Sequence, residues 1–398
     1  MISDIILRNE QKIVFLVLDG VGDIPDKRFS YKTPLEAAKK PNIDKLSQEY
    51  GVLGRIIPVE IGVTPGSGPG HLSLFGYDPL QYDIGRGVLE ALGLDIELEE
   101  GDLAVRANFC TIKDGIVTDR RAGRLKTEET ERICAQLAKN IDRINNTKVI
   151  IVPGKSHRFV VIFRGGNLSD KLADGDPHKD GMPYVYPKPK VKEAEYTSNL
   201  VNMFLEKALK VITSEEVANG ILLRGFSMKP KLPLFPDKYK MQAAAIATFP
   251  MYRGISRILG MKVIGNPKTY GEAISLLKEN YNDFQFFFIH IKETDIAGED
   301  GNFEAKIRVI EEVDHLVSEI WDLAPDVVVI TGDHSTPCLI KGHSWHPVPL
   351  LVLNRKGETD GLSFHEKNSL MGSIGTIYSK HLMNLVLAMS AKLDKFGA

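Results

Sequence analysis

Carboxylate and imidazole side chains that could bind metal ions follow two strongly apolar stretches of the chain. Asp19 comes directly after the run Ile13–Leu18, and Asp333 and His334 come soon after the run Val327–Ile330. Such a run is typical of a strand buried on both faces, so the polar residues after it lie at the edge of a sheet, where open α/β sheets bind ligands. Oxygen and nitrogen donors at that edge suit a divalent cation such as Mn²⁺, Zn²⁺ or Mg²⁺.

A serine in a turn rich in glycine and proline adds a candidate nucleophile. Ser67 precedes the segment His71–Phe75, which has a helical pattern. A serine just before a helix has backbone N–H groups directed at any phosphate it carries, although a capping serine is also common there. The GxSxG motif of serine hydrolases does not fit, because Pro65 and Pro69 stand where its glycines belong.

Further candidate ligands lie in the last third of the chain. Asp295 and Glu299 have the i,i+4 spacing that places both carboxylates on one face of a helix, although an ordinary acidic loop could show the same pair. His343 follows closely after His334. The whole set suffices for two cations, and a serine hydroxyl coordinated to a cation is an activated nucleophile. These residues therefore predict a two-metal site for phosphoryl transfer.

The charges of the chain are nearly balanced, with 50 Lys and Arg against 52 Asp and Glu. This balance provides no general attraction to nucleic acid or to an anionic membrane. Three cysteines without a CxxC pair form neither a disulfide framework nor a thiolate zinc site, and they fit a reducing compartment. No stretch has the pattern of a signal peptide or a transmembrane helix. We expect a cytoplasmic protein without a nucleic-acid or membrane partner.

The elements that must position these residues alternate between strand and helix. Apolar runs at residues 13–18, 284–291, 327–331 and 349–353 predict strands of a parallel sheet, and the helical patterns between them predict a doubly wound α/β core. One helical pattern, at residues 306–323, has an apolar stripe that includes Ile310 and Val317. Its charged residues, Lys306 and Asp314 among them, are expected to face water.

The length of 398 residues predicts two domains. The middle of the chain has shorter strand patterns between polar, arginine-rich loops, which predict an inserted second domain. The acidic stretch Glu97–Asp102 and the Pro- and Lys-rich stretch Met228–Lys240 have the composition of linkers. We therefore expect a core domain formed by residues 1–98 and 238–398, and an inserted domain at residues 99–237.

Taken together, these motifs resemble those of the archaeal-type cofactor-independent phosphoglycerate mutases, which belong to the alkaline phosphatase superfamily. The segments that carry the resemblance are DGVGD around Asp19, PGSGPGHLSLFGYDP around Ser67, KETDIAGEDGNFEAK around Asp295, TGDHSTP around Asp333 and HSWHPVP around His343. The family usually has histidine in place of Glu299, and Asp-Thr-Ala in place of residues 68–70, which are Gly-Pro-Gly here.

The resemblance implies an alkaline-phosphatase-like α/β core with a smaller inserted α/β domain. It also implies that the protein interconverts 3-phosphoglycerate and 2-phosphoglycerate in glycolysis through a phosphoserine, without 2,3-bisphosphoglycerate. Ser67 would be the nucleophile, and two divalent metal ions (Mn, Mg, Co or Zn) would be bound. The implied ligands are Asp19, Ser67, Asp333 and His334 for one metal, and Asp295, Glu299 and His343 for the other.

The substrate, phosphoglycerate, is a small polyanion, and guanidinium groups bind carboxylate and phosphate with two hydrogen bonds at once. The expected substrate-binding residues are Arg120, Arg121 and Arg124, followed by His157, Arg158, Arg106 and Arg224. Asp119 is expected to move a proton between the substrate hydroxyls. Two alternatives stay open: a metal-dependent phosphomonoesterase or kinase-like relative on the same scaffold, and a non-catalytic metabolite-binding protein, which only Glu299 suggests.

Overall fold

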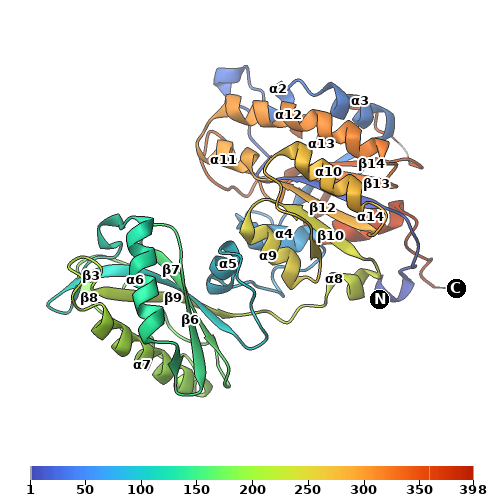
Figure 1. Cartoon of the computed structure of the whole chain (residues 1–398). Coiled ribbons are helices and arrows are strands. Elements are labelled where there is room, and N and C mark those ends of the chain that lie inside the picture. Colours follow the sequence, from blue (N-terminus) through green and yellow to red (C-terminus); the bar gives the residue numbers. More distant parts are fainter. Residues whose placement is uncertain (1, 358, 398) are drawn as a thin grey trace. The chain divides into compact units, whose positions relative to one another are not determined.

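The computed structural model describes residues 2–357 and 359–397. The chain divides into two compact units, and the second, Ile84–Lys231, is inserted into the first, which ends at Asp83 and resumes at Leu232 (Figure 1). The expected boundaries were residues 98/99 and 237/238, so the inserted unit begins and ends earlier in the chain than the composition of the linkers indicated. Within the described residues, no helix combines the length and the apolar character that a membrane crossing requires.

The first unit is built on an eight-stranded mixed sheet. Its strands, in spatial order, are β11 (Lys262–Val263), β10 (Ala243–Ala247), β12 (Phe286–Ile291), β1 (Ile13–Leu18), β13 (Val327–Thr331), β14 (Val348–Asn354), β2 (Gly51–Ile57) and β15 (Gly375–Tyr378). Every residue of β1, β12, β13 and β14 is buried, as expected of apolar runs covered on both faces. The expectation of a parallel sheet is wrong for β14, which runs antiparallel to both β13 and β2.

Helices surround this sheet, as the doubly wound layout requires (Figure 1). They are α1 (Ile2–Ile5), α2 (Pro34–Ala37), α3 (Pro41–Tyr50), α4 (Ser67–Leu74), α8 (Phe235–Tyr239), α9 (Pro250–Ile258), α10 (Tyr270–Asn280), α11 (Glu293–Glu299), α12 (Phe303–Asp322), α13 (Glu366–Ser369) and α14 (Leu382–Met389). The prediction of an α/β core with a smaller inserted α/β domain is confirmed.

Helix α12 has the apolar stripe that its sequence predicts, since Ile310 and Val317 are fully buried. The expectation that Lys306 and Asp314 face water is wrong, because their exposed fractions are 0% and 1%. Asp314 accepts hydrogen bonds from the backbone N–H of Asn42 (3.1 Å) and Ile43 (2.8 Å). These N–H groups belong to the first turn of α3 and have no partner within their own helix. The buried carboxylate of Asp314 supplies the acceptors that they need.

The inserted unit has a seven-stranded antiparallel sheet and a core of its own. Its strands are β3 (Leu103–Lys113), β4 (Ile116–Asp119), β5 (Arg143–Ile144), β6 (Thr147–Pro153), β7 (Arg158–Arg164), β8 (Met182–Pro183) and β9 (Gly220–Met228). Helices α6 (Thr127–Asn140) and α7 (Glu195–Val211) lie along this sheet (Figure 1). Aromatic rings fill the core: Phe109 stacks on Phe159 with ring centroids 4.4 Å apart.

Helix α5 (Arg86–Gly93) explains why the inserted unit begins early. The backbone N–H of Val88 donates to Oγ of Ser227 at 2.9 Å, which joins α5 to β9. Gly87 lies so close to β3 that a Cβ atom would be 2.1 Å from the carbonyl oxygen of Ala104. Asp102, which the sequence placed in a linker, is buried and forms an ion pair with Arg164 at 2.7 Å. The stretch before β3 is therefore part of the folded unit.

Candidate metal centre

Three neighbouring strands of the first unit direct their polar C-terminal residues to one edge of the sheet. Strand β1 lies between β12 and β13, with Leu18 paired to Ile291 and Val17 paired to Thr331. Asp19 follows β1, and Asp333 follows β13. The chain after β12 enters α11, which carries Asp295. Adjacent parallel strands in register thus place three carboxylates, distant in sequence, at the same edge.

The first ligand group surrounds Nε2 of His334. This nitrogen lies 3.3 Å from Oδ1 of Asp19 and 3.2 Å from Oδ2 of Asp333. Oγ of Ser67 lies 3.5 Å from the same nitrogen. All three partners are residues that the sequence predicted as ligands of one metal, and the structure brings them together from three separate segments. Ligand atoms of Asp19, Asp333 and His334 lie within 4.8 Å of one another.

The buried oxygens of this group fit a divalent cation. Asp19 and Asp333 have exposed fractions of 0%, yet Oδ1 of Asp19 and Oδ2 of Asp333 have no hydrogen-bond partner in the described part of the chain. A buried anionic oxygen without a partner is costly, and native proteins rarely leave one unsatisfied. A cation between these oxygens would remove that cost, and oxygen with imidazole nitrogen is a suitable donor set for Mn²⁺ or Zn²⁺.

The loop of Ser67 is held against this group by Gly70 and His71. Ser67 is the first residue of α4, and Nδ1 of His71 lies 2.9 Å from its carbonyl oxygen. A Cβ atom at residue 70 would lie 2.6 Å from the carbonyl oxygen of Asp333, so only glycine allows the approach of α4 to the loop after β13. Gly70, the last residue of the Gly-Pro-Gly sequence at residues 68–70, therefore has a steric role here.

The second ligand group contains Asp295 and His343. Oδ1 of Asp295 lies 3.6 Å from Nε2 of His343 and 4.0 Å from Nδ1 of His334. Nδ1 of His343 lies 3.0 Å from the carbonyl oxygen of Pro65, and a proton on Nδ1 leaves the lone pair of Nε2 available to a metal. Asp295, His334 and His343 have ligand atoms within 4.8 Å of one another.

Glu299 lies near the second ligand group, but it does not belong to the set of residues whose ligand atoms lie within 4.8 Å of one another. Asp295 and Glu299 are on one helix, α11, as their spacing predicts. Oε1 of Glu299 is 3.9 Å from Nε2 of His343, and its side chain is 55% exposed. The geometry therefore brings His334, rather than Glu299, closest to Asp295 and His343.

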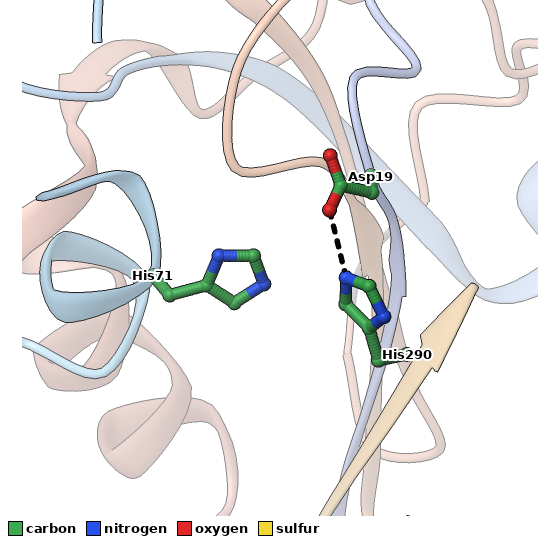
Figure 2. Close-up of side chains that lie close together, drawn as sticks. All are labelled: Asp19, His71 and His290. Carbon is green, nitrogen blue, oxygen red and sulfur yellow. Dashed lines mark hydrogen bonds and ion pairs between the residues drawn. The ribbon is translucent and has the colours of Figure 1, made fainter. Parts of the chain in front are cut away.

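Two histidines that the sequence analysis did not single out contact the metal ligands. Figure 2 shows the ring of His290 directed at Asp19, with the ring of His71 opposite them. Nε2 of His290 lies 2.9 Å from Oδ2 of Asp19, and Nδ1 of His71 lies 3.2 Å from Oδ2 of Asp333. An imidazole inside the otherwise apolar strand β12 was the signal for His290, because a buried polar side chain needs a partner.

Lys292 also contacts this centre, through the oxygens on the outer side of two carboxylates. Its Nζ lies 2.6 Å from Oδ2 of Asp295 and 3.3 Å from Oδ2 of Asp19. Burial raises the pKa of Asp19, but the hydrogen bond from His290 and the charges of Lys292 and His334 outweigh it and hold that pKa well below its usual range. Asp19 is therefore an anion at neutral pH, which is the form that can bind a cation.

The inserted unit places the expected substrate-binding arginines in two different situations. Arg120 donates two hydrogen bonds of 2.8 Å to Asp176, and Arg224 lies 3.6 Å from the same carboxylate. Arg121 and Arg124 are exposed and have no ion-pair partner among the described residues. Two of the predicted residues are thus engaged with a protein carboxylate, and two are free to bind an anion.

Asp119 holds the loop that carries Arg121 and Arg124. Its Oδ1 accepts from the backbone N–H of Arg121 at 2.8 Å, and its Oδ2 accepts from that of Gly123 at 2.7 Å. Ala122, Gly123 and Arg124 have successive φ angles of 44°, 65° and 57°. Left-handed residues other than glycine cost about 1–2 kcal/mol each, so this conformation persists only because side chains such as Asp119 fix it.

His157 lies within a group of positive charges. Burial, together with the charges of Arg158, Arg121 and Arg106, lowers the pKa of His157 to about 4. Burial and the charges of Arg224, Arg158 and Arg86 lower the pKa of Arg106, although Glu90, 3.8 Å from its Nε, acts in the opposite direction. Arg106 and Arg224 face each other in register on β3 and β9. A group of like charges on neighbouring strands is typical of a site for an anionic ligand. Arg86, on α5, was not predicted as part of it.

Comparison with known proteins places the chain in one family along its whole length. A family model described as "2,3-bisphosphoglycerate-independent phosphoglycerate mutase" matches residues 49–218. A protein of Thermotoga maritima named "Probable 2,3-bisphosphoglycerate-independent phosphoglycerate mutase" is 50% identical over 399 residues, which cover 100% of this chain and 98% of the relative. A relative of the same name from Aquifex aeolicus is 45% identical over 409 residues and covers 100% of both chains.

A solved structure has the same fold. The "Cofactor-Independent Phosphoglycerate mutase" from Thermoplasma acidophilum superimposes with a TM-score of 0.79 at 30% identity, covering 96% of this chain and 100% of the other. The resemblance drawn from the five motifs is therefore confirmed. The chain belongs to the family of 2,3-bisphosphoglycerate-independent phosphoglycerate mutases, which are isomerases.

Proposed function

We propose that this chain interconverts 3-phosphoglycerate and 2-phosphoglycerate, a step of glycolysis, through a phosphoserine formed at Ser67. The observation that carries the proposal is the position of Oγ of Ser67, 3.5 Å from Nε2 of His334. The same nitrogen lies 3.3 Å from Oδ1 of Asp19 and 3.2 Å from Oδ2 of Asp333, two buried oxygens that accept no hydrogen bond in the described part of the chain. In this mechanism Oγ attacks the phosphorus atom at the 3-position, and the 3-oxygen leaves and takes up a proton. The 2-hydroxyl of the bound glycerate then attacks the phosphoserine, and Ser67 is regenerated.

The metal ligands follow from the two groups. Asp19, Ser67, Asp333 and His334 would hold one divalent cation, and Asp295 and His343 the other. Glu299, 3.9 Å from His343, would have to move closer to serve as a further ligand of the second cation. Such cations lower the pKa of a coordinated hydroxyl and offset charge on phosphoryl oxygens. The first turn of α4 supports the same role for Ser67, because its unpaired backbone N–H groups favour a phosphate at that position.

The arginines of the inserted unit fit the anionic groups of the substrate. Arg121 and Arg124 are free for this role, and Arg106, Arg158 and Arg224 supply further positive charge near His157. Arg120 would act through Asp176, as part of the structure that supports the site. The two hydrogen bonds of Asp119 favour a role in holding the arginine loop over the expected role in proton transfer.

A coupled assay on metal-stripped protein tests the proposal. Mn²⁺, Mg²⁺, Co²⁺ and Zn²⁺ are returned one at a time, and both 2-phosphoglycerate and free phosphate are measured with 3-phosphoglycerate as substrate. We expect no turnover without metal, and isomerisation with little free phosphate when an active metal is returned. Release of phosphate as the main product would instead identify a phosphomonoesterase, and binding of phosphoglycerate without turnover at any metal would identify a metabolite-binding protein.

A further inference from the structure

We infer that Lys306 is a positioning residue for the metal centre, because its buried ammonium group joins the two loops that carry the first ligand group. Lys306 lies in the first turns of α12, and its exposed fraction is 0%. Its Nζ donates to the carbonyl oxygens of Gly20 and Thr336 and to Oδ2 of Asp23, each at 2.9 Å. The carbonyl oxygen of Gly22 lies farther from Nζ, at 3.4 Å, so the three acceptors at 2.9 Å take the three N–H bonds of the ammonium group.

The acceptors lie next to the candidate ligands in sequence. Gly20 directly follows Asp19, and Thr336 lies two residues after His334. The two loops also bond to each other, since the backbone N–H of Thr336 lies 3.2 Å from the carbonyl oxygen of Gly20 and 3.0 Å from that of Gly22. Lys306 thus donates hydrogen bonds where the loop after β1 contacts the loop after β13.

Asp23 adds an ion pair to the hydrogen bonds that Lys306 makes with the two loops. Its carboxylate, 7% exposed, accepts from Nζ of Lys306 and also from the backbone N–H of Cys338 at 3.1 Å and of Ile24 at 2.9 Å. The ion pair therefore reaches both loops at once. Removing the ammonium takes the cationic donor from the buried Asp23 carboxylate and one of two donors from the carbonyl oxygen of Gly20. It also leaves the buried carbonyl oxygen of Thr336 without its donor, and such losses are costly inside a protein.

The consequence concerns metal affinity, and it rests on the proposed metal site. Asp19, Asp333 and His334 keep their spacing only while the two loops keep theirs. Loss of a group that orients metal ligands from outside typically weakens metal binding by about 10- to 100-fold. Lys306 touches none of the ligand side chains that would bind the metal, so its contribution is made through the backbone of both loops.

The test compares Lys306→Met with Lys392→Met. Lys392 is a matched control in the same unit: it also has an exposed fraction of 0%, and its Nζ donates to the carbonyl oxygen of Asn9 at 2.9 Å, far in sequence from either loop. Isothermal titration with Mn²⁺ alone gives the affinity of each protein, and urea unfolding gives its stability. We expect both variants to lose stability, and only Lys306→Met to bind Mn²⁺ about 10- to 100-fold more weakly than the wild type.

Two results would overturn the inference. If folded Lys306→Met binds Mn²⁺ with an affinity within about twofold of that of the wild type, Lys306 serves the fold alone. Failure of the wild type to bind Mn²⁺ is a different outcome, because it would remove the proposed metal site as well. If Lys306→Met does not fold, hydrogen exchange of the wild type supplies the second test. Mn²⁺ should slow exchange of the Thr336 and Cys338 amides, which share acceptors with Lys306, and unchanged exchange would contradict the inference.

Discussion

The two units of the chain carry candidate functional side chains of opposite charge, and in each set some buried atoms accept or donate no hydrogen bond within the described residues. In the first unit Asp19 and Asp333 bury carboxylate oxygens without hydrogen bonds, and in the inserted unit Arg106 and Arg224 bury Nε atoms without them. Under the proposed function, cations would bind to the first set and an anion would bind to the second. The comparison indicates that buried charged groups without hydrogen bonds can mark a ligand site. The ligand expected there has a charge opposite to that of the buried groups.

The largest expected effect follows from removing the nucleophile of the first unit. Ser67→Ala should lower isomerisation by at least about 10³-fold, because the phosphoryl group then has no covalent acceptor. Ser73→Ala is the control, because Ser73 is a buried serine on the same helix, and this variant should stay active. Mass spectrometry of the wild type during turnover should find phosphate on Ser67. Activity in Ser67→Ala, or phosphate on another residue, would exclude the phosphoserine route.

A smaller effect is expected from the inserted unit. Arg121→Ala and Arg124→Ala should each raise KM for phosphoglycerate by about 10- to 100-fold, since a charged hydrogen bond to an anion contributes about 1.5–3 kcal/mol. They should also raise the share of turnovers that end as free phosphate. Arg132→Ala is the control, because Arg132 is 57% exposed and already paired with Glu215. Unchanged KM and unchanged phosphate release in both variants would show that the arginine loop is only surface charge.

Glu299 sharpens the comparison at the second ligand group. With two divalent cations, the carboxylates of Asp19, Asp295, Asp333 and Glu299 and an ionised Ser67 leave the centre with about one excess negative charge, whereas histidine at residue 299 would leave it neutral. Glu299→His should therefore raise activity with Co²⁺ and Zn²⁺ several-fold relative to activity with Mg²⁺ and Mn²⁺. Glu299→Gln separates loss of charge from gain of imidazole. An unchanged ranking and affinity in both would place residue 299 outside the coordination sphere.

The smallest effect concerns stability alone. Burial raises the pKa of Glu366 from 4.5 to about 7. A carboxyl group whose pKa is higher in the folded state stabilises the fold below its ordinary pKa, and this stability is lost as pH rises through about 7. The side chain in Glu366→Gln cannot ionise. Between pH 4.5 and pH 8, the free energy of unfolding of this variant should therefore fall by about 3 kcal/mol less than that of the wild type. Urea unfolding at both pH values measures this, with exposed Glu49→Gln as control; parallel curves would refute it.

The first unit was largely predictable because its strands end where apolar runs end. The run Ile13–Leu18 has the bounds of β1, and the residues after β1 and β13 meet at one edge because parallel strands in register must bring them there. The direction of β14 was not predictable, since an apolar run has the same composition in either orientation. The candidate ligands were predicted from motifs, and a histidine inside an apolar strand was a signal for His290, whereas no local pattern specifies the contacts of Lys292.

Charged residues on α12 mark the limit of arguments from periodicity. Such arguments assign charge to the solvent side, yet Lys306 and Asp314 find partners on segments hundreds of residues away. The arginine loop of the inserted unit shows a related limit. Its composition predicted anion binding, but the left-handed backbone from Ala122 to Arg124 and the engagement of Arg120 with Asp176 arise from tertiary contacts.

The inserted unit has one more property that follows from helix α5. Its chain enters at Ile84 and leaves at Lys231, and near these ends Gly85 lies so close to Ser227 that a Cβ atom would be 2.3 Å from the serine Cβ. A module whose ends meet, with its own core, can be cut out and expressed as residues 84–231, or exchanged for the equivalent module of a relative. The proposed binding of an anion by its arginines could then be measured in the absence of any metal, and exchange of the module would test whether it determines substrate preference.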